Sequence, residues 1–350
     1  MEKMIVAVIF GGCSNEYEVS LQSAYSVITH MDQDKYEKVL IGITKEGHWY
    51  RYQGSVENIL NNTWWCDEVN CTPAFFSPNR YENYLLENRN GHVIETMIDI
   101  VFPVLHGKNG EDGTLQGYLE LIGIPYVGCD TLSSALCMDK DRAHKLVELE
   151  GIKTPDSIVF SRSQVIEEIV TQTSLLQLPL FVKPVKSGSS IGITLVTEKE
   201  ELPSAVAEAF SYDERIIIEE YIEGYEVGCA ILGNEDLIVG EVDEIELETG
   251  YFDFNEKYTL TTSSIHMPAR IDKDMKAKVK DMAIQIYRAL GCSGLARVDM
   301  FITPNRDIVF NEVNTFPGFT NHSRYPNMMK GIGLTFSNII DRLIQLGLER

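Results

Sequence analysis

The first 130 residues alternate between short apolar strands and segments with helical spacing, and this alternation limits the fold more than any other feature. Met4–Phe10 is a continuous apolar run that Gly11-Gly12 ends, and similar runs follow at 38–44 and 98–105. Continuous apolar strands are typical of parallel sheets that are covered on both faces. The pattern predicts a doubly wound α/β domain, which binds ligands at the carboxyl ends of its strands.

Two further units with mixed strands and helices follow, so the fold class is α/β with an α+β part. We expect three domains, with bounds at 1–127, 128–213 and 214–350. A single helix is predicted over 133–150. Residues 51–96 are polar and poorly patterned, and we interpret them as surface insertions.

Charge and composition exclude several classes of protein. The 350 residues carry 30 Lys and Arg against 52 Asp and Glu, a formal net charge of −22. Such an excess of acid disfavours nucleic-acid binding and association with an anionic membrane. The seven cysteines include no CxxC pair, which favours reduced thiols over a zinc site or a disulfide framework. No apolar run reaches the roughly 18 residues that span a bilayer, and we expect a cytoplasmic protein.

The strongest chemical signal is a pair of strands near the carboxyl end, 295–302 and 308–314, joined by a short turn-rich connection. Alternation along a strand places Arg297 beside Asp299, and Glu312 beside Asn314. We expect the two strands to be antiparallel neighbours, which makes one patch of these four side chains. Two carboxylates and an amide oxygen suit Mg²⁺, whereas a solvated polar face with a surface salt bridge is the simpler alternative.

Two segments earlier in the chain give weaker signals of a nucleotide site. Lys183 ends a strand, and the turn that follows, Ser187-Gly-Ser-Ser-Ile-Gly192, could point backbone N–H groups at phosphate oxygens. Glu219 and Glu220 end the next apolar strand. Their carboxylates could accept hydrogen bonds from an adenine amino group and from ribose hydroxyls. Taken alone, the Gly/Ser turn is more typical of a hairpin loop, and the acidic segment is more typical of an acidic hairpin.

Two loops follow apolar strands in the first domain. Gly11-Gly12-Cys13-Ser14-Asn15-Glu16 lacks a complete dinucleotide fingerprint, but its carboxylate could hold a substrate ammonium. The loop that begins at His106 is a ligand-site candidate by position, although a single loop histidine is more often solvated. Trp64 and Trp65 are interpreted as packing groups.

Together these segments resemble the D-alanine–D-alanine ligase family of ATP-grasp enzymes over nearly the whole chain. The resemblance is carried by seven segments in family order: GGCSNEYEVSLQSA, HGKNGEDGTLQGYLELIGIPYVGCDTLSSALCMDK, KPVKSGSSIGI, IIIEEYIEGYEV, EKYT, GLARVDMF and NEVNTFPGFTNHSRYP. It implies an ATP-grasp fold behind an amino-terminal doubly wound domain. It also implies a ligase that joins D-amino acids, with ATP as co-substrate and two Mg²⁺ ions, Mn²⁺ being the alternative.

The resemblance implies a role for each matching residue. ATP contacts are expected from Lys140, Lys183, Gly188, Ser189, Ser190, Glu219, Glu220, Ile222, Glu226 and Lys257, and metal contacts from Asp299, Glu312 and Asn314. Catalytic roles fall to Glu16, Ser189, Tyr258 and Arg297, with Arg297 at the oxyanion. Substrate contacts are expected from Glu16, His106, Phe252, Tyr258, Arg297, Gly318, Ser323 and Arg324. The segment 251–264 is expected to form a lid, and the family suggests a homodimer.

The second substrate is D-alanine, D-serine or D-lactate. The Lys257-Tyr258 pair, which the lactate-using branch lacks, favours an amine nucleophile. Arg324 and Phe252 stand where D-alanine enzymes of the family carry an aliphatic residue and a tyrosine. They resemble the D-alanine–D-serine ligases of vancomycin resistance, because a guanidinium can donate to a serine hydroxyl. The alternative is that Arg324 forms an unrelated surface or interface pair.

Two other classes of protein compete with this interpretation. A non-catalytic nucleotide sensor on the same fold should lack one or more of the four residues of the strand pair, yet all four are present. A dinucleotide-dependent oxidoreductase should carry a complete glycine fingerprint, which is absent. The alternative within the family is a D-alanine–D-alanine ligase of ordinary cell-wall synthesis.

Overall fold

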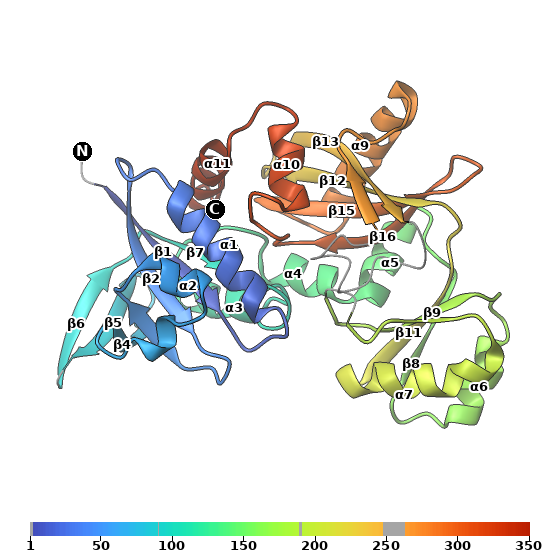
Figure 1. The fold of residues 1–350 in the computed structure, drawn as a ribbon, viewed down its shortest axis with the longest axis horizontal. Coiled ribbons are helices and arrows are strands. Elements are labelled where there is room, and N and C mark those ends of the chain that lie inside the picture. Colours follow the sequence, from blue (N-terminus) through green and yellow to red (C-terminus); the bar gives the residue numbers. More distant parts are fainter. Residues whose placement is uncertain (1–2, 90, 189–190, 248–262) are drawn as a thin grey trace.

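The computed structural model describes residues 3–89, 91–188, 191–247 and 263–350. They form three sheets, which contain seven, four and five strands. Figure 1 shows the seven-stranded sheet at one end of the molecule, and the four- and five-stranded sheets at the other end with helices α4 and α5 between the two ends. No helix of the described residues is long and apolar enough to cross a membrane.

The amino-terminal sheet has a parallel centre, as the apolar runs predict. Strand β1 (Met4–Gly11) lies parallel to both β2 (Tyr36–Ile43) and β7 (Ile100–Val104). Helix α1 (Tyr17–His30) packs on one face, and α3 (Thr114–Ile122) belongs to the core of the other. The parallel part is limited to these three strands, so the domain is a mixed sheet with a doubly wound centre.

The interpretation of residues 51–96 as surface insertions was wrong. The segment continues the sheet in the order β6-β5-β4-β3-β2, with every neighbour antiparallel. The added elements are short, which is why their alternation is hard to detect in the sequence. They are β3 (Trp49–Tyr52), α2 (Val56–Leu60), η1 (Trp64–Cys66), β4 (Cys71–Phe76), β5 (Tyr84–Arg89) and β6 (His92–Met97). Trp64 is fully buried in the core, but Trp65 is half exposed.

The single helix predicted over 133–150 is two helices, α4 (Thr131–Met138) and α5 (Lys140–Leu149). Asp139 lies between them with extended backbone, and its side chain accepts a hydrogen bond from the N–H of Arg142. An aspartate in that position caps the second helix and ends the first. The break fixes Lys140 at the first position of α5.

The central sheet has the order β10-β9-β11-β8, and all its neighbours are antiparallel. Its apolar side chains form one core with the helices below it in Figure 1. β11 comes after the predicted domain boundary at 213 but pairs with β8 and β9, so a division by sheets would follow Glu220. The elements are β8 (Ser157–Ser161), α6 (Ile166–Thr173), β9 (Leu180–Pro184), β10 (Thr194–Val196), η2 (Lys199–Glu201), α7 (Leu202–Tyr212) and β11 (Arg215–Glu220).

The carboxy-terminal sheet is antiparallel in the order β14-β13-β12-β15-β16. Its strands are β12 (Tyr225–Leu232), β13 (Ile238–Leu247), β14 (Ser263–His266), β15 (Leu295–Ile302) and β16 (Ile308–Asn314). Helix α9 (Lys273–Ala289) packs on β12, β13 and β15 and contributes to the core of this domain. Ala296, Val298 and Met300 of β15 are fully buried, so the apolar face predicted for that strand is confirmed.

The last helices return the chain to the amino-terminal domain. α10 (Arg324–Lys330) packs on β12 and β13, and α11 (Phe336–Leu348) packs on α1 and β7. Leu343 and Ile344 of α11 share one core with Val6 and Phe102 of the first sheet. The carboxy-terminal end therefore holds the first and last domains together.

Candidate active site

The predicted patch on β15 and β16 is present. The strands are antiparallel neighbours, with Arg297 opposite Asn314 and Asp299 opposite Glu312. Nε of Arg297 donates to Oδ1 of Asp299 at 2.8 Å, and Nδ2 of Asn314 donates to Oδ2 of Asp299 at 3.0 Å. Asp299 is buried, which argues against the alternative of a solvated surface face.

This patch fits a hard divalent cation by its donor set. Asp299, Glu312 and Asn314 offer two carboxylates and an amide, which are the oxygen ligands that Mg²⁺ prefers. Among the described residues no group of three or more His, Cys, Asp or Glu side chains is arranged to hold a metal, so the fit rests on this mixed set. Burial opposes the charge of Arg297, but the adjacent Asp299 outweighs it and raises the pKa of the guanidinium.

Two lysines that were predicted to contact ATP, Lys140 and Lys183, form ion pairs near the patch on β15 and β16. Nζ of Lys183, on β9, lies 2.5 Å from Oε2 of Glu219, on the neighbouring β11. Nζ of Lys140 donates to the carbonyl of Ser187 at 2.7 Å and lies 3.9 Å from Oε2 of Glu312. Lys140 therefore connects the turn after β9 with strand β16.

Glu219 carries a charge in a fully buried position. Burial raises the pKa of this carboxyl, but Lys183, His144 and Lys140 together outweigh it and hold the pKa below its ordinary value. Nε2 of His144, which is also buried, lies 3.0 Å from the carbonyl oxygen of Asn311 on β16. An ionised Glu219 on the central sheet is therefore held by Lys183, while Lys140 and His144 extend from α5 to the strand β16.

The other adenine-side residues lie at the junction of the two sheets. Glu220 accepts a hydrogen bond from the N–H of Gln177 at 2.7 Å. Ile222 is half-buried in the connection between β11 and β12. Glu226, expected at the ribose, lies at the start of β12 and forms an ion pair with Nη1 of Arg324 at 2.9 Å.

Glu16 directly precedes α1, and parts of two other segments surround it. A Cβ on Gly107 would overlap its carboxylate, and a Cβ on Gly188 would lie 2.8 Å from Oε2. Gly188 belongs to the turn after β9 of the central domain, so the amino-terminal carboxylate and the phosphate turn are in close contact. A side chain at either position would force the Glu16 carboxylate to move.

His106 is buried, so the alternative of a solvated loop histidine was wrong. Nε2 lies 2.9 Å from Oγ of Ser23 on α1, and Nδ1 lies 3.0 Å from the carbonyl oxygen of Phe316. Burial lowers the pKa of His106 to about 4, so the ring is neutral at physiological pH. Because both ring nitrogens have protein partners, His106 positions the segment after β16 rather than offering a donor to substrate.

Glu111 holds the backbone of the same residue, Phe316, through its N–H group. Its Oε1 accepts from the N–H of Phe316 at 3.1 Å, and its Oε2 accepts from the N–H of Gly107 at 2.7 Å. Burial first, and the neighbouring Glu16 carboxylate second, raise the pKa of Glu111 well above its ordinary value. Two acids that lie against Gly107 repel each other when both are ionised, and this repulsion favours the proton on Glu111.

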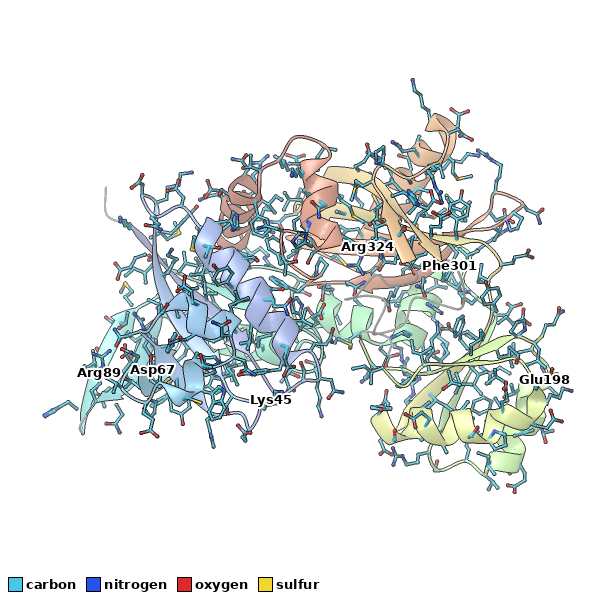
Figure 2. All side chains as sticks on the ribbon, viewed as in Figure 1. Lys45, Asp67, Arg89, Glu198, Phe301 and Arg324 are labelled. Atoms are coloured by element: carbon cyan, nitrogen blue, oxygen red, sulfur yellow. The ribbon has the colours of Figure 1, made fainter. Side chains whose placement is uncertain are left out.

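Arg324 is buried in a network of carboxylates (Figure 2 places it beside β15). Nε and Nη2 donate to the two oxygens of Asp243 at 2.7 and 2.8 Å, and Nη2 lies 3.5 Å from Oδ1 of Asp299. The prediction of an acceptor-site guanidinium stays a prediction. The structure adds that two hydrogen bonds to Asp243 fix the guanidinium, which lies next to the predicted metal ligand Asp299.

Gly318 and Ser323 lie between β16 and α10. Oγ of Ser323 accepts from the N–H of Thr320 at 2.9 Å, and a Cβ on Gly318 would lie 3.1 Å from that oxygen. Ser323 directly precedes α10, whose first residue is Arg324. One short segment therefore carries Gly318, Ser323 and Arg324, three of the residues expected to contact substrate.

Five predicted site residues lie outside the described residues. Ser189 and Ser190 belong to the turn after β9, and Phe252, Lys257 and Tyr258 belong to the segment predicted to form a lid. Their roles stay predictions.

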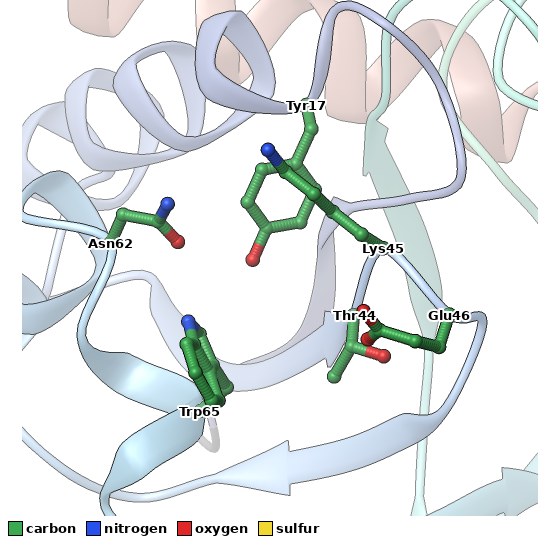
Figure 3. Close-up of a pocket in the computed structure, with 6 residues that line it drawn as sticks. All are labelled: Tyr17, Thr44, Lys45, Glu46, Asn62 and Trp65. Atoms are coloured by element: carbon green, nitrogen blue, oxygen red, sulfur yellow. The ribbon is translucent and has the colours of Figure 1, made fainter.

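A cavity of about 180 Å³ lies beside the start of α1, and none of its lining residues was predicted to act. Figure 3 shows the Lys45 side chain crossing the ring of Tyr17, with Asn62 and Trp65 on the other side. Nζ of Lys45 lies 5.0 Å from the ring centroid. All the lining residues belong to the amino-terminal domain, so the cavity is separate from the metal strands.

Sequence reasoning missed three residues that the structure brings into the site. Glu111 was noted only as part of its loop, and His144 and Asp243 were not considered. His144 and Asp243 are buried ionisable residues inside a helix and a strand, which is the one signal that could have found them; Glu111 lies in a polar loop and gives no such signal. Their partners are far away in the sequence, so pairing could not be predicted.

Comparisons with known proteins agree with this geometry. The family model described as D-ala D-ala ligase N-terminus matches residues 5–129, and the one described as D-ala D-ala ligase C-terminus matches residues 146–345. The D-alanine–D-alanine ligase of Caldicellulosiruptor bescii is 44% identical over 355 residues, covering 100% of this chain and 96% of that relative. The vancomycin C-type resistance protein VanC1 of Enterococcus gallinarum is 45% identical over 347 residues and covers 98% of both chains.

Among solved structures, the VanG D-Ala:D-Ser ligase from Enterococcus faecalis superposes with a TM-score of 0.91 at 58% identity, covering 99% of this chain and 100% of that one. The D-alanine–D-alanine ligase of Coxiella burnetii superposes with a TM-score of 0.88 at 34% identity, covering 100% and 95%. With both halves of the chain matched and the metal strands in place, the chain belongs to the D-alanine–D-alanine ligase family and has its ATP-grasp fold.

Proposed function

We propose that this protein joins D-alanine to D-serine with ATP, making a dipeptide for modified peptidoglycan precursors and thereby vancomycin resistance. The observation that carries the proposal is the fixed guanidinium of Arg324 beside Asp299. The 58% identity to a structure described as a D-Ala:D-Ser ligase supports it. A cytoplasmic location is part of the proposal.

The family is ATP-dependent and generally uses divalent metal ions. In our proposal Asp299, Glu312 and Asn314 hold two Mg²⁺ ions, Mn²⁺ being the alternative. A bound divalent ion neutralises phosphoryl charge. Lys140 and Lys183 contact the phosphates of ATP, and the Gly188 turn lies over them.

The reaction proceeds in two steps. Glu16 binds the ammonium of D-alanine, whose carboxylate oxygen attacks the γ-phosphorus of ATP and expels ADP. The product is an acyl phosphate, in which phosphate is a good leaving group. The amine of D-serine then attacks the carbonyl carbon, loses a proton and expels inorganic phosphate. Arg297 stabilises the oxyanion, since a fixed donor there contributes about 3–4 kcal/mol.

Arg324 can select D-serine because its orientation is fixed and its donors are not exhausted. Asp243 and Glu226 occupy three of the five N–H groups of the guanidinium. A hydroxyl placed against it gains a hydrogen bond that D-alanine lacks. A site built to bond a hydroxyl leaves buried donors unpaired when the analogue without one binds, and so discriminates against it.

Competition between the two acceptors tests the proposal. The enzyme is mixed with ATP, Mg²⁺, D-alanine and D-serine, and the dipeptides are identified by mass spectrometry while phosphate release is measured. D-alanyl-D-serine should be the main product. If D-alanyl-D-alanine dominates, the chain is a D-alanine–D-alanine ligase. If no amino-acid-dependent phosphate release occurs, the chain is a non-catalytic nucleotide sensor.

Arg324→Lys tests the selector more sharply than Arg324→Leu. Leucine would leave Asp243 buried without a partner and endanger folding, whereas lysine keeps the charge but loses the two-bond geometry. We expect the ratio of kcat/KM for D-serine to that for D-alanine to fall about tenfold. Arg342→Lys, on the exposed side of α11, is the matched control. An unchanged ratio in Arg324→Lys would show that another residue selects the acceptor.

A further inference from the structure

The cavity of about 180 Å³ beside the start of α1 lies outside the candidate active site, and its lining is polar. Its side chains come from three parts of the amino-terminal domain: Tyr17 of α1, Thr44, Lys45 and Glu46 of the turn after β2, and Asn62 and Trp65 of the stretch between α2 and β4. Because a cavity of about 150 Å³ can hold benzene, this one has room for a molecule of roughly six to eight non-hydrogen atoms.

Asn62 offers an acceptor that the protein itself does not use. Its Oδ1 atom is buried and has no hydrogen-bond partner among the described residues. Figure 3 shows the side-chain amide directed toward Tyr17, on the far side of the cavity. Leaving a buried acceptor without a donor is costly, so this atom indicates a ligand group that donates an N–H or O–H.

Tyr17 and Trp65 offer donors to the same space. Nε1 of Trp64 donates to the hydroxyl oxygen of Tyr17 at 3.0 Å, and no acceptor for the O–H group of Tyr17 is found within the described parts of the chain. Burial chiefly, and then the carboxylates of Glu18 and Glu46, raise the pKa of Tyr17 to about 12 against the opposite effect of Trp64, so the phenol keeps its proton. In Figure 3 this hydroxyl and the indole nitrogen of Trp65 both face the cavity. Two such donors suit a carboxylate.

The cavity also has a charge of each sign in its lining. Nζ of Lys45 lies 5.0 Å from the centroid of the Tyr17 ring and donates to Glu18, which leaves two of its three N–H groups for a ligand. A hydrogen bond from Thr44 lowers the pKa of Glu46, so this carboxyl is ionised. Glu46 would repel a simple anion and Lys45 would repel a simple cation, whereas a molecule that carries both charges can be attracted by both residues.

We propose that this cavity binds a small free α-amino acid as a zwitterion. The carboxylate of the amino acid accepts hydrogen bonds from Tyr17 and Trp65, and its ammonium donates to Oδ1 of Asn62. Lys45 and Glu46 are the neighbours of the two charges. Glycine, alanine and serine have the size that the cavity requires.

The proposed site is separate from the one that receives the substrates. Tyr17 follows Glu16 in the sequence, but the carboxylate of Glu16 lies against Gly107 and Gly188 and does not line the cavity. The proposal therefore goes beyond the ligase function and does not depend on which acceptor the enzyme uses.

Tryptophan fluorescence of the full chain, measured without ATP, tests the charge requirement. Glycine is the probe because it is achiral, and it should change the emission saturably at millimolar concentration. Acetate and methylamine each carry one of the two charges, and they should bind about tenfold more weakly or less. No saturable response to glycine, or equal affinity for all three compounds, would overturn the proposal.

Trp65→Phe identifies the reporter among the three tryptophans of the chain. Trp65 is half exposed and lines the cavity, so the variant should lose the response to glycine. A response that persists in Trp65→Phe would come from binding elsewhere and would contradict the proposed site.

Asn62→Gly tests the contact with the ammonium. Asn62 has a φ of 54°, which glycine adopts freely, so the variant loses the amide without backbone strain. Its dissociation constant for glycine should rise at least about tenfold. Asn83→Gly is the matched control, because Asn83 has a φ of 52° in the same domain but does not line the cavity. Unchanged affinity in Asn62→Gly, or equal weakening in both variants, would exclude the site.

Glu16→Gln separates the cavity from the substrate site. The variant should bind the first D-alanine more weakly and keep the wild-type response to glycine. Loss of that response would show that glycine binds in the substrate site, and the proposal would fail. Asn62→Gly should keep wild-type ligase activity with either acceptor, so the failure of this proposal and the failure of the proposed function are distinguishable.

Discussion

The part of the candidate site that we assign to the nucleotide and the part that we assign to the amino acids handle charge in opposite ways. On the nucleotide side, Lys183 and Glu219 form a buried ion pair on neighbouring strands of one sheet. On the amino-acid side, two acids from the first domain, Glu16 and Glu111, both contact Gly107, and burial together with their proximity raises the pKa of Glu111.

This difference shows what each side is built to receive. In our proposal the Lys183–Glu219 ion pair is formed before ATP arrives, so it holds the two strands in place and positions the cation in advance. The paired acids are unfavourable in the absence of a cation, and a substrate ammonium would relieve them. We infer that binding energy is gained on the amino-acid side and that geometry is set in advance on the nucleotide side.

The largest expected effect lies at Asp299, where the two sides meet. Asp299→Asn removes a charged metal ligand, and we expect kcat/KM to fall by roughly a thousandfold, equivalent to about 4 kcal/mol. Mn²⁺ affinity, measured by calorimetry, should fall as well. Asp307→Asn in the turn between the same strands is the control, because Asp307 is exposed and pairs with Lys153. Equal Mn²⁺ affinity in the Asp299 variant and the wild type would contradict the metal assignment.

A smaller effect is expected at Glu16. Glu16→Gln should raise KM for the first D-alanine roughly 10- to 100-fold, because a hydrogen bond to a charged group contributes about 1.5–3 kcal/mol. KM for ATP should not change. Glu18→Gln, two residues further on and paired with Lys45 in solvent, should leave both values unchanged. If Glu16→Gln raised KM for ATP as much as KM for D-alanine, Glu16 would not belong to the amino-acid side alone.

Lys183→Met tests whether the nucleotide side is set in advance. We expect KM for ATP to rise about tenfold and the protein to lose stability, because Glu219 would be left as a buried charge. Glu219, whose pKa is lowered in the fold, stabilises the protein above the ordinary pKa of a carboxyl, and this stabilisation is lost as the pH falls. The variant should therefore lose part of this acid-dependent change in melting temperature. Lys186→Met, at an exposed position, is the comparison; a similar loss in both variants would contradict the prediction.

The smallest effect concerns the pH dependence of stability at Glu111. Its raised pKa means that the folded protein keeps a proton that the unfolded chain has lost, so stability falls as the pH rises above the ordinary pKa of a carboxyl. Glu111→Gln removes this dependence. The melting temperature of the wild type should fall relative to the variant, by a few degrees, between about pH 5 and pH 8. Parallel curves would show that Glu111 does not titrate in this range.

Much of the fold could be predicted because the relevant pattern is local. The strands at 215–220, 295–302 and 308–314 are where their apolar alternation predicted them, and the face that carries Arg297 and Asp299 follows from that alternation. The segment 51–96 could not be predicted, because strands of four to six residues leave too little alternation to detect. The break at Asp139 was a local signal, an N-cap, that the helical spacing on both sides concealed.

The surroundings of Arg324 show why a residue type alone did not define its contacts. The sequence indicated a donor near the acceptor, but Asp243 and Glu226, which fix it, are about 80 and 100 residues away along the chain. His106 and Glu111 are similar, since both contact the backbone of Phe316 from another domain, one at its carbonyl oxygen and the other at its N–H group.

The sequence alone determined the strands, their faces and the set of groups available for chemistry, because side-chain alternation and helix capping depend on neighbours in the chain. The tertiary structure decided which charges meet: Glu16 with the Gly188 turn, Glu111 with Phe316, Arg324 with Asp243. Such contacts depend on how three sheets pack, and electrostatic energy depends on distance and burial, neither of which is encoded in local pattern.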